Sequence, residues 1–209
     1  MLEIHHFLKK YPTGFHLEIE FLKLEKGIHL IQGENGAGKS TLFKAIAGIQ
    51  TYSGNIILDH IDLKKHPLPY RQQVNFSEAE PLFPGFLSLD DLIIFVSKAK
   101  KATENQIKVL KETFQVSSFS ANPISTYSSG MLKKTSLLLA FLGEPKLIIL
   151  DEPFTTIDTG SQDFLIRLIE QKSADGVSFL LSTHQKAFVD LLSFKSVHRL
   201  LHGTMISHQ

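Results

Sequence analysis

A glycine-rich segment with one lysine and two hydroxyl residues is the strongest chemical signal in the chain. It fits the phosphate-binding pattern G-x-x-x-x-G-K-[ST]. Its residues are Gly33, Glu34, Asn35, Gly36, Ala37, Gly38, Lys39, Ser40 and Thr41. Glycines let backbone N–H groups turn inward around an anion, and a following helix adds the partial positive charge of its N-terminus. Lys39 can reach the β- and γ-phosphates of a nucleotide, and the Ser40 hydroxyl can bind Mg²⁺.

An acidic pair after an apolar run is the second signal. Residues 147–150 are all apolar, and Asp151 and Glu152 follow them. A carboxylate at the end of a buried strand can hold Mg²⁺, directly or through water, beside bound phosphates. The next carboxylate can orient a water molecule for in-line attack on the γ-phosphate. We therefore predict that Asp151 belongs to the metal site and that Glu152 is the general base.

The elements around these motifs predict an α/β fold. The phosphate loop lies between a predicted buried strand, 27–32, and a predicted helix, 41–48. Further strands are predicted at 2–8, 15–21, 55–58, 74–76, 146–151, 177–182, 197–201 and 204–207. Further helices are predicted at 89–100, 103–115, 131–142, 160–172 and 185–192, and the polar stretch 59–73 carries no predicted element. Apolar strands that end in polar residues indicate a parallel sheet buried on both faces, and residues 85–140 read as a helical insertion into it.

Composition narrows the class of protein. The 209 residues, 43% of them hydrophobic, suit one domain with a sizeable core, which we assign to 1–209. The net charge of +1 gives no support for a nucleic-acid-binding protein. The chain has no cysteine, its N-terminus does not resemble a signal peptide, and its apolar runs are shorter than the ~20 residues that span a bilayer.

A loop at 78–87 combines two prolines and a glycine with a high density of apolar residues. Prolines and glycine argue against regular structure there. The apolar residues have two explanations, which the sequence leaves open. The loop either folds onto the core or forms a docking surface for a partner.

Together the motifs resemble those of ATP-binding-cassette (ABC) ATPases in order and spacing. The matching segments are Gly33–Thr41, Tyr127–Met131, Leu147–Pro153, Thr156–Asp158 and Ser182–His184. The specific marker is Ser128-Ser129-Gly130-Met131, which resembles the family signature, usually Leu-Ser-Gly-Gly-Gln. The sequence departs from the family at Lys133-Lys134, where many members have Gln-Arg. The resemblance implies the ABC ATPase fold, with a parallel core sheet, an N-terminal antiparallel β subdomain and an inserted helical subdomain at about 85–140.

The resemblance also implies roles for single residues. Glu78 stands where the family has its Q-loop glutamine, which senses Mg²⁺, and Glu80 is a less favoured candidate. Asp158 matches the D-loop acid that acts across a dimer. His184 matches the switch histidine that contacts the γ-phosphate.

One residue of such a site stacks on adenine. Tyr11 is the best match for this aromatic residue, and Phe15 is its rival. An alternative of equal weight is that Tyr11 is a turn residue that packs on the strand pair.

As a member of that family, the chain would hydrolyse ATP with Mg²⁺ and drive transport. The resemblance implies a head-to-tail homodimer or heterodimer, in which Ser128 and Gly130 of one subunit meet the γ-phosphate bound by the other. It further implies a separate transmembrane permease subunit, contacted through the 78–97 region, and a cytoplasmic location on the inner face of the cell membrane. No nucleic-acid partner is expected. The alternatives are a soluble ABC ATPase outside transport, a regulatory nucleotide-binding module and, more weakly, a P-loop kinase. Glu152 and His184 argue against the regulatory module, which needs neither residue.

Overall fold

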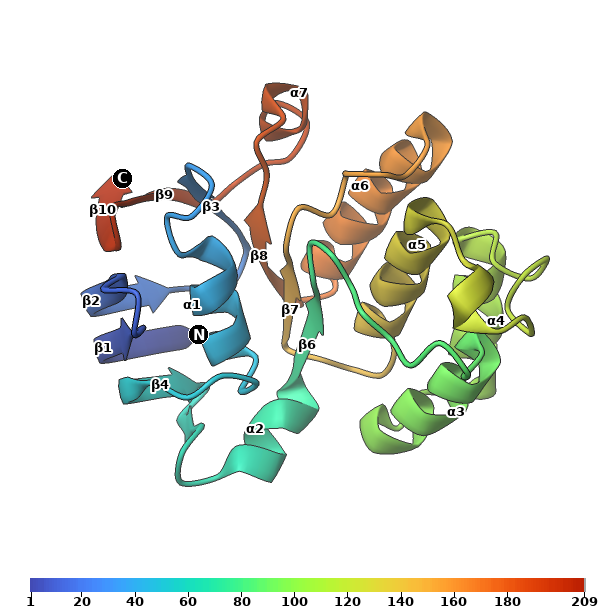
Figure 1. The fold of residues 1–209 in the computed structure, drawn as a ribbon, viewed down its shortest axis with the longest axis horizontal. Helices are drawn as coiled ribbons and strands as arrows, with labels where there is room; N and C mark the ends of the chain where they lie inside the picture. The colour runs from blue at the N-terminus through green and yellow to red at the C-terminus, as the bar shows by residue number, and fades with distance from the viewer. Residues whose placement is uncertain (209) are drawn as a thin grey trace.

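One mixed sheet of ten strands runs through the protein, with helices packed along it (Figure 1). The computed structural model describes residues 1–208, without the side chains of residues 186, 187 and 206–208. The spatial order of the strands is β5-β4-β1-β2-β10-β9-β3-β8-β7-β6. Their bounds are β1 Leu2–Lys10, β2 His16–Leu24, β3 Ile28–Gly33, β4 Ser53–Leu58, β5 Ile61–Asp62, β6 Val74–Ser77, β7 Leu147–Leu150, β8 Ser178–Ser182, β9 Ser196–Leu201 and β10 Thr204–His208.

The sheet has a parallel part and an antiparallel part, as predicted. Strands β9, β3, β8, β7 and β6 are parallel neighbours. Strand β1 pairs antiparallel with β2 on one side and with β4 on the other. The predicted terminal hairpin is confirmed as β9 and β10, and β10 joins the two parts through a parallel contact with β2. The carboxyl ends of β3, β7 and β8 therefore lie at one edge, where the two motifs meet.

The parallel strands separate two hydrophobic cores. In β7, Ile148 and Leu150 face the core formed with α3, α4, α5 and α6, whereas Leu147 and Ile149 face the core formed with α1 and the antiparallel strands. This period of two is the geometry of a strand, and burial on both faces explains why the run is apolar throughout. Figure 1 shows α1 between the antiparallel strands at the left and the helical part at the right.

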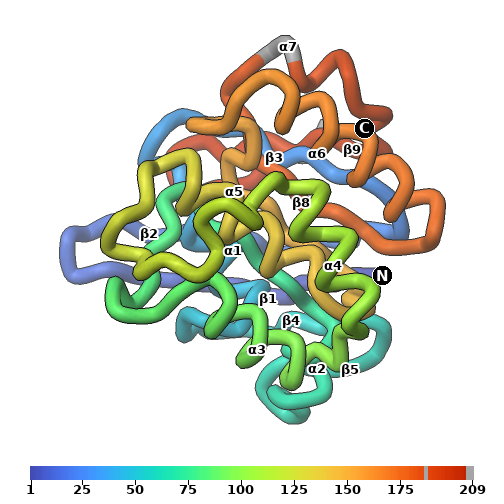
Figure 2. Tube along the Cα trace, turned by 90° about the vertical axis from the view of Figure 1, so that its right-hand side faces the viewer, coloured from blue at the N-terminus to red at the C-terminus, as the bar shows by residue number. Residues whose placement is uncertain are grey.

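A group of helices lies between β6 and β7 in the chain. The helices of the protein are α1 Lys39–Ile46, α2 Pro67–Gln73, α3 Leu89–Lys100, α4 Glu104–Thr113, the 3₁₀ turn η1 Ile124–Thr126, α5 Ser129–Ala140, α6 Thr159–Ala174 and α7 Lys186–Val189. In Figure 2, α3 and α4 lie on the side turned to the viewer, in front of the parallel strands. Helix α3 begins with a capping box, since Ser88 accepts from Asp91 N and the Asp91 carboxylate accepts from Ser88 N.

Two sequence predictions need correction. The stretch 59–73 contains β5 and α2, although no element is predicted there. Helix α2 is short and begins at Pro67, a residue suited to a first helical position because no backbone N–H is needed there, and it buries Tyr70. One buried side chain gives no helical periodicity to detect. The helix predicted over 185–192 is too long, because α7 ends at Val189.

A chain of buried polar side chains joins β3 to β9. His29 and His198 are both nearly inaccessible to solvent. His29 Nε2 lies 2.7 Å from Glu25 O, and its Nδ1 lies 2.7 Å from Ser196 Oγ, which lies 2.7 Å from His198 Nε2. A carbonyl only accepts, so His29 Nε2 carries the proton. Burial holds the pKa of His29 below its ordinary value, which favours the neutral ring at neutral pH. In the neutral ring Nδ1 accepts from Ser196 Oγ, and Ser196 Oγ can then accept from His198 Nε2.

We predict that acid weakens the fold through these histidines. Burial lowers the folded-state pKa of both His29 and His198. Below about pH 6.5, the ordinary histidine pKa, these two histidines therefore bind more protons in the unfolded chain than in the folded chain. The free energy of unfolding should fall between about pH 7 and pH 5, by up to about 1.4 kcal/mol per pH unit for each histidine.

Chemical denaturation of wild type and His29→Gln over this pH range tests the prediction. Glutamine keeps an N–H donor for Glu25 O but does not titrate, so the slope against pH should become shallower. His66→Gln, at an exposed residue before α2, is the matched control and should keep the wild-type slope. An unchanged slope in His29→Gln contradicts the assignment.

Candidate functional site

The phosphate loop has a backbone that only glycine adopts readily. Gly36 and Gly38 have φ of 82° and 108°, and Gly38 is the N-cap of α1. Gly33 is required for another reason, because a Cβ there would lie 2.7 Å from Leu200 O in the neighbouring strand. The loop therefore turns sharply from β3 into α1 and directs the free N–H groups of the helix start toward one point.

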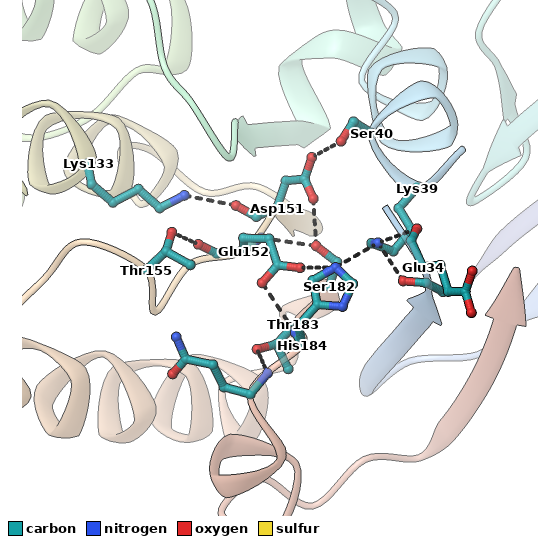
Figure 3. Close-up of polar contacts among 12 residues, drawn as sticks. Glu34, Lys39, Ser40, Lys133, Asp151, Glu152, Thr155, Ser182, Thr183 and His184 are labelled. Atoms are coloured by element: carbon teal, nitrogen blue, oxygen red, sulfur yellow. Dashed lines mark hydrogen bonds and ion pairs between the residues drawn. The ribbon is translucent and has the colours of Figure 1, made fainter. Parts of the chain in front are cut away.

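Lys39 is held at the mouth of this loop by groups that a phosphate can replace. Its Nζ donates to Gly33 O at 2.7 Å and Glu34 O at 3.1 Å, and lies 3.0 Å from His184 Nε2 (Figure 3). An ammonium has no lone pair and only donates, so His184 Nε2 is the acceptor in this contact. Burial lowers the pKa of Lys39, while Glu152 and Asp151 oppose the shift. The charge is thus available for an anion that enters the pocket.

Asp151 carries a carboxylate that is almost fully buried, with 2% of the residue exposed. Its Oδ2 accepts from Ser40 Oγ at 2.6 Å, and its Oδ1 accepts from Ser182 Oγ at 2.5 Å. These bonds join the end of β7 to the start of α1 and the end of β8 (Figure 3). Sequence reasoning missed Ser182 as a site residue. One feature of the sequence could have indicated Ser182. It is a hydroxyl residue at the last position of a buried strand, β8, and β8 lies beside the strand that ends just before Asp151.

Glu152 adopts a strained backbone beside this carboxylate. Its φ is 45°, in the left-handed region that non-glycine residues rarely occupy. Its N–H donates to Ser182 Oγ at 3.0 Å, and Thr155 Oγ1 donates to its carbonyl at 2.9 Å. The side chain turns toward His184, whose N–H donates to Oε2 at 3.3 Å. His184 Nε2 is 3.2 Å from Oε1 but without hydrogen-bond alignment, as expected while this nitrogen accepts from Lys39.

A pocket of about 590 Å³ collects most of the predicted residues. Its lining includes Tyr11, Asn35, Gly36, Gly38, Lys39, Ser40, Thr41, Asp151, Glu152 and His184, together with Phe15 and Glu80. The lining therefore combines the carboxylates of Asp151 and Glu152, the lysine and the phosphate loop with two aromatic rings. The volume and the mixture of polar and aromatic groups suit a nucleotide.

The two candidate glutamates occupy different surroundings. Glu78 forms an ion pair with Lys44, with Nζ 2.9 Å from Oε2, and lines a neighbouring groove. Glu80 lines the nucleotide-sized pocket itself. Pairing with Lys44 offsets the negative charge that Glu78 would bring near a metal ion. The role of Glu78 at that ion stays a prediction.

The signature residues lie outside this pocket lining, at the start of α5. Ser128 caps the helix by accepting from Met131 N at 3.2 Å, and Ser129 is its first residue. At Gly130 a Cβ would lie 2.8 Å from Thr156 O, so the helix start packs directly against the segment after Glu152. The signature and the predicted D-loop therefore form one continuous surface.

Asp158 belongs to the same surface. Its carboxylate pairs with Lys134 Nζ at 2.9 Å and caps α6 by accepting from Ser161 N at 2.9 Å. Lys134, and then Ser161, hold the pKa of Asp158 well below its ordinary value. Asp158 is therefore ionised at neutral pH.

Tyr11 and Phe15 both line the pocket, with ring centroids 6.0 Å apart. The Tyr11 hydroxyl lies 3.1 Å from Thr41 Oγ1 and also accepts from Gln50 Nε2. Both rings are thus available to an adenine, and Tyr11 is fixed to the first turn of α1.

Comparisons with known proteins give one consistent result. A family model described as "ABC transporter" matches residues 19–155. The lantibiotic transport ATP-binding protein SrtF of Streptococcus pyogenes is 27% identical over 195 residues, which cover 92% of this chain and 84% of SrtF. A solved ATP-binding subunit of an ABC transporter superposes with a TM-score of 0.88 at 27% identity, over 99% of this chain and 90% of that one.

A more distant solved structure matches in fold. The ATP-binding cassette MJ0796, a dimer in a post-hydrolysis state with ADP and Pi, has a TM-score of 0.84 at 16% identity and covers 100% of this chain and 99% of its own. The predicted fold class is therefore confirmed.

We predict that Tyr11 supplies the stacking surface for adenine. Tyr11→Ala should weaken ATP binding about 10-fold, since stacking on a base is typically worth about 1–3 kcal/mol. Tyr11→Phe should keep most of the affinity because the ring remains. Inorganic triphosphate has no base, so titration calorimetry should find its affinity unchanged in all variants. Wild-type ATP affinity in Tyr11→Ala, with weak binding in Phe15→Ala, would assign the role to Phe15.

Proposed function

Since this chain belongs to the ABC transporter family, we propose that it drives transport through a separate permease subunit, with residues 1–209 acting as one ATP-binding domain. The chain is an ATPase subunit of that family. The observation that carries the proposal is the convergence of Lys39, Ser40, Asp151, Glu152 and His184 on one pocket beside the phosphate loop. A regulatory module that only binds nucleotide needs neither Glu152 nor His184 there.

The residues around Asp151 fit a magnesium ion. Mg²⁺ prefers oxygen ligands and is usually held by one or two protein groups together with substrate phosphates. Ser40 Oγ and the Asp151 carboxylate are 2.6 Å apart at the base of the pocket, so both oxygens face the same space. When bound, the ion would neutralise charge on the β- and γ-phosphates. Glu78 remains a proposed third contributor from the neighbouring loop.

Hydrolysis would use the chain's own groups in a defined order. An entering triphosphate offers Lys39 stronger acceptors than the carbonyls of Gly33 and Glu34, and it takes Lys39 away from His184. His184 is then free to turn its ring toward the γ-phosphate. Glu152, fixed by its backbone contacts, accepts a proton from the attacking water.

The signature residues support a site completed by a second subunit. The N-terminus of α5 is an anion-binding position, and Ser128 and Ser129 are exposed there. These residues do not line their own subunit's pocket. A two-fold, head-to-tail dimer would bring Ser128 and Gly130 of each subunit to the γ-phosphate of the other and form two equal sites.

We expect Glu152→Gln to bind ATP but to hydrolyse it about 10²-fold more slowly or worse, the usual scale for a lost general base. Because nucleotide would bridge the subunits and no longer be cleaved, the variant should also form a stable dimer with ATP. Steady-state ATPase assays and size-exclusion chromatography measure the two effects. Near-normal turnover would refute the role of Glu152.

The bridging position is tested in the same background. Adding Ser128→Arg places a bulky charge at the interface and should abolish the dimer without abolishing ATP binding. In a separate test, Lys39→Ala and Ser128→Arg subunits that both keep Glu152 are mixed. Mixing should restore ATPase activity, because one site of the heterodimer then carries neither lesion. Dimerisation of the double variant would contradict a site shared between subunits.

An apolar groove beside loop 78–87 supports a permease partner. The groove has a volume of about 410 Å³ and is lined by residues that include Phe76, Leu82, Phe83 and Leu139. Phe83 packs against the core, whereas Leu82 and Phe86 are 92% and 83% exposed. Among residues 1–208, no helix has the length and hydropathy to cross a bilayer.

Charge in the groove defines the partner further. Arg71 donates to Gly48 O, and Lys100 donates to Arg71 O and Val74 O, so both cations are held by carbonyls. The one acid of the lining, Glu78, is paired with Lys44. We therefore propose that the occupant is a permease segment with an apolar face and a carboxylate, on the inner face of the membrane.

Phe86→Glu should weaken co-purification with the permease subunit while leaving the thermal stability unchanged, because Phe86 is already exposed. Phe21→Glu, at an exposed phenylalanine on β2, is the control and should bind normally. Retention of the permease by Phe86→Glu, or unfolding of the variant, would instead indicate that the loop serves core packing.

A further inference from the structure

We propose that Lys133 is a positioning residue that fixes the peptide bond between Asp151 and Glu152 and links it to the start of loop 78–87. The proposal rests on the proposed role of Glu152 as general base. It gives a function to a lysine that departs from the Gln-Arg found in many family members, and that the chemistry described above does not use.

Lys133 places one ammonium group between three segments of the chain. It lies on the signature helix α5 and is 1% exposed. Its Nζ donates to Asp151 O at 2.8 Å, to Glu78 O at 2.8 Å and to Ala79 O at 3.3 Å. Figure 3 shows the side chain extending from α5 toward the backbone of Asp151. The three N–H donors of the ammonium thus have three backbone acceptors.

The peptide bond between Asp151 and Glu152 is held at both ends. Its carbonyl accepts from Lys133, and its N–H donates to Ser182 Oγ at 3.0 Å. The next torsion is the strained φ of 45° at Glu152. A left-handed residue outside glycine persists only where the surroundings hold it, and such residues cluster at functional sites. The two hydrogen bonds hold the peptide group that directly precedes the strained φ angle. They therefore help to determine where the Glu152 carboxylate lies.

Burial makes the cation both costly and hard to replace. It lowers the pKa of Lys133 to about 8, and the nearby Asp151 and Glu152 oppose the shift. The ammonium is therefore largely retained at neutral pH. An apolar side chain of similar length would fill the space but would remove the donor from the buried carbonyl of Asp151 and from the partly buried carbonyls of Glu78 and Ala79.

The same ammonium reaches the proposed docking region. Glu78 and Ala79 begin the loop whose next residues, Pro81, Leu82 and Phe83, line the groove. A partner that shifts this loop must move two of the three acceptors of Lys133. The third acceptor is the carbonyl of Asp151, next to Glu152. The Lys133 ammonium therefore connects the loop beside the groove to the backbone of the proposed base.

The test compares Lys133→Met and Lys133→Gln with Ile148→Val. Methionine removes all three donors at similar length, whereas glutamine keeps N–H donors. Ile148, 1% exposed in β7, makes no polar side-chain contact, and its truncation controls for a modest loss of stability in the same strand. We expect Lys133→Met to lower kcat about 10-fold or more, as misplaced catalytic groups do, with KM and ATP affinity within about 2-fold of wild type. Lys133→Gln should recover part of kcat, and Ile148→Val should keep it.

Combination with Glu152→Gln separates the two proposals. In that background Lys133→Met should cause no further loss in single-turnover hydrolysis, because the carboxylate that it positions is gone. A wild-type kcat in Lys133→Met overturns the positioning role. So does a loss of hydrolysis rate from Lys133→Met that is equally large in the wild-type and Glu152→Gln backgrounds. If Lys133→Met does not fold, Lys133→Gln alone tests the proposal. If both variants fold and kcat falls in proportion to the free energy of unfolding, Lys133 has only a structural role. Normal turnover in Glu152→Gln instead overturns the base itself.

Discussion

The site depends on burying the Asp151 carboxylate without leaving it unsatisfied. An ionised carboxylate is costly to remove from water unless hydrogen-bond donors replace the water. Here the donors are two hydroxyls, Ser40 at the start of α1 and Ser182 at the end of β8. Meeting this requirement brings the phosphate loop and two parallel strand ends to one position. The geometry of the pocket follows from the solvation of one charge.

Three lysines that are partly or fully withdrawn from solvent follow a related rule with different consequences. Lys39, Lys100 and Lys133 are all held largely by backbone carbonyls. Lys39 faces an open pocket, so an incoming phosphate can replace its carbonyl partners. Lys133 is enclosed, and its three bonds are exchanged for others only if the backbone moves. The same kind of contact therefore serves ligand binding at one residue and a fixed structural link at another, and accessibility decides which.

The arrangement also supports the proposal that two subunits share each site. The phosphate loop and the acids share a pocket, while the N-terminus of α5 opens onto a surface formed with Thr156 and Asp158. Ser128 and Gly130 do not line the pocket that holds the phosphate loop of their own subunit. A second subunit supplies the missing contacts in the proposed dimer.

The sequence by itself determined the fold class, the phosphate loop and the order of the motifs. These are local signals: glycine spacing, apolar runs of strand length and capping residues such as Ser128 are written in adjacent positions. Helix α2 was not predicted because a seven-residue helix with one buried side chain shows no hydrophobic periodicity. Tertiary structure alone decided that Ser182 binds Asp151, that Glu78 pairs with Lys44 while Glu80 lines the pocket, and that Lys133 joins α5 to Glu152. Some of these contacts link residues that are 18 to 111 positions apart, and others depend on the direction in which a loop side chain points. Neither the long-range pairing nor the side-chain direction is encoded in a local sequence pattern.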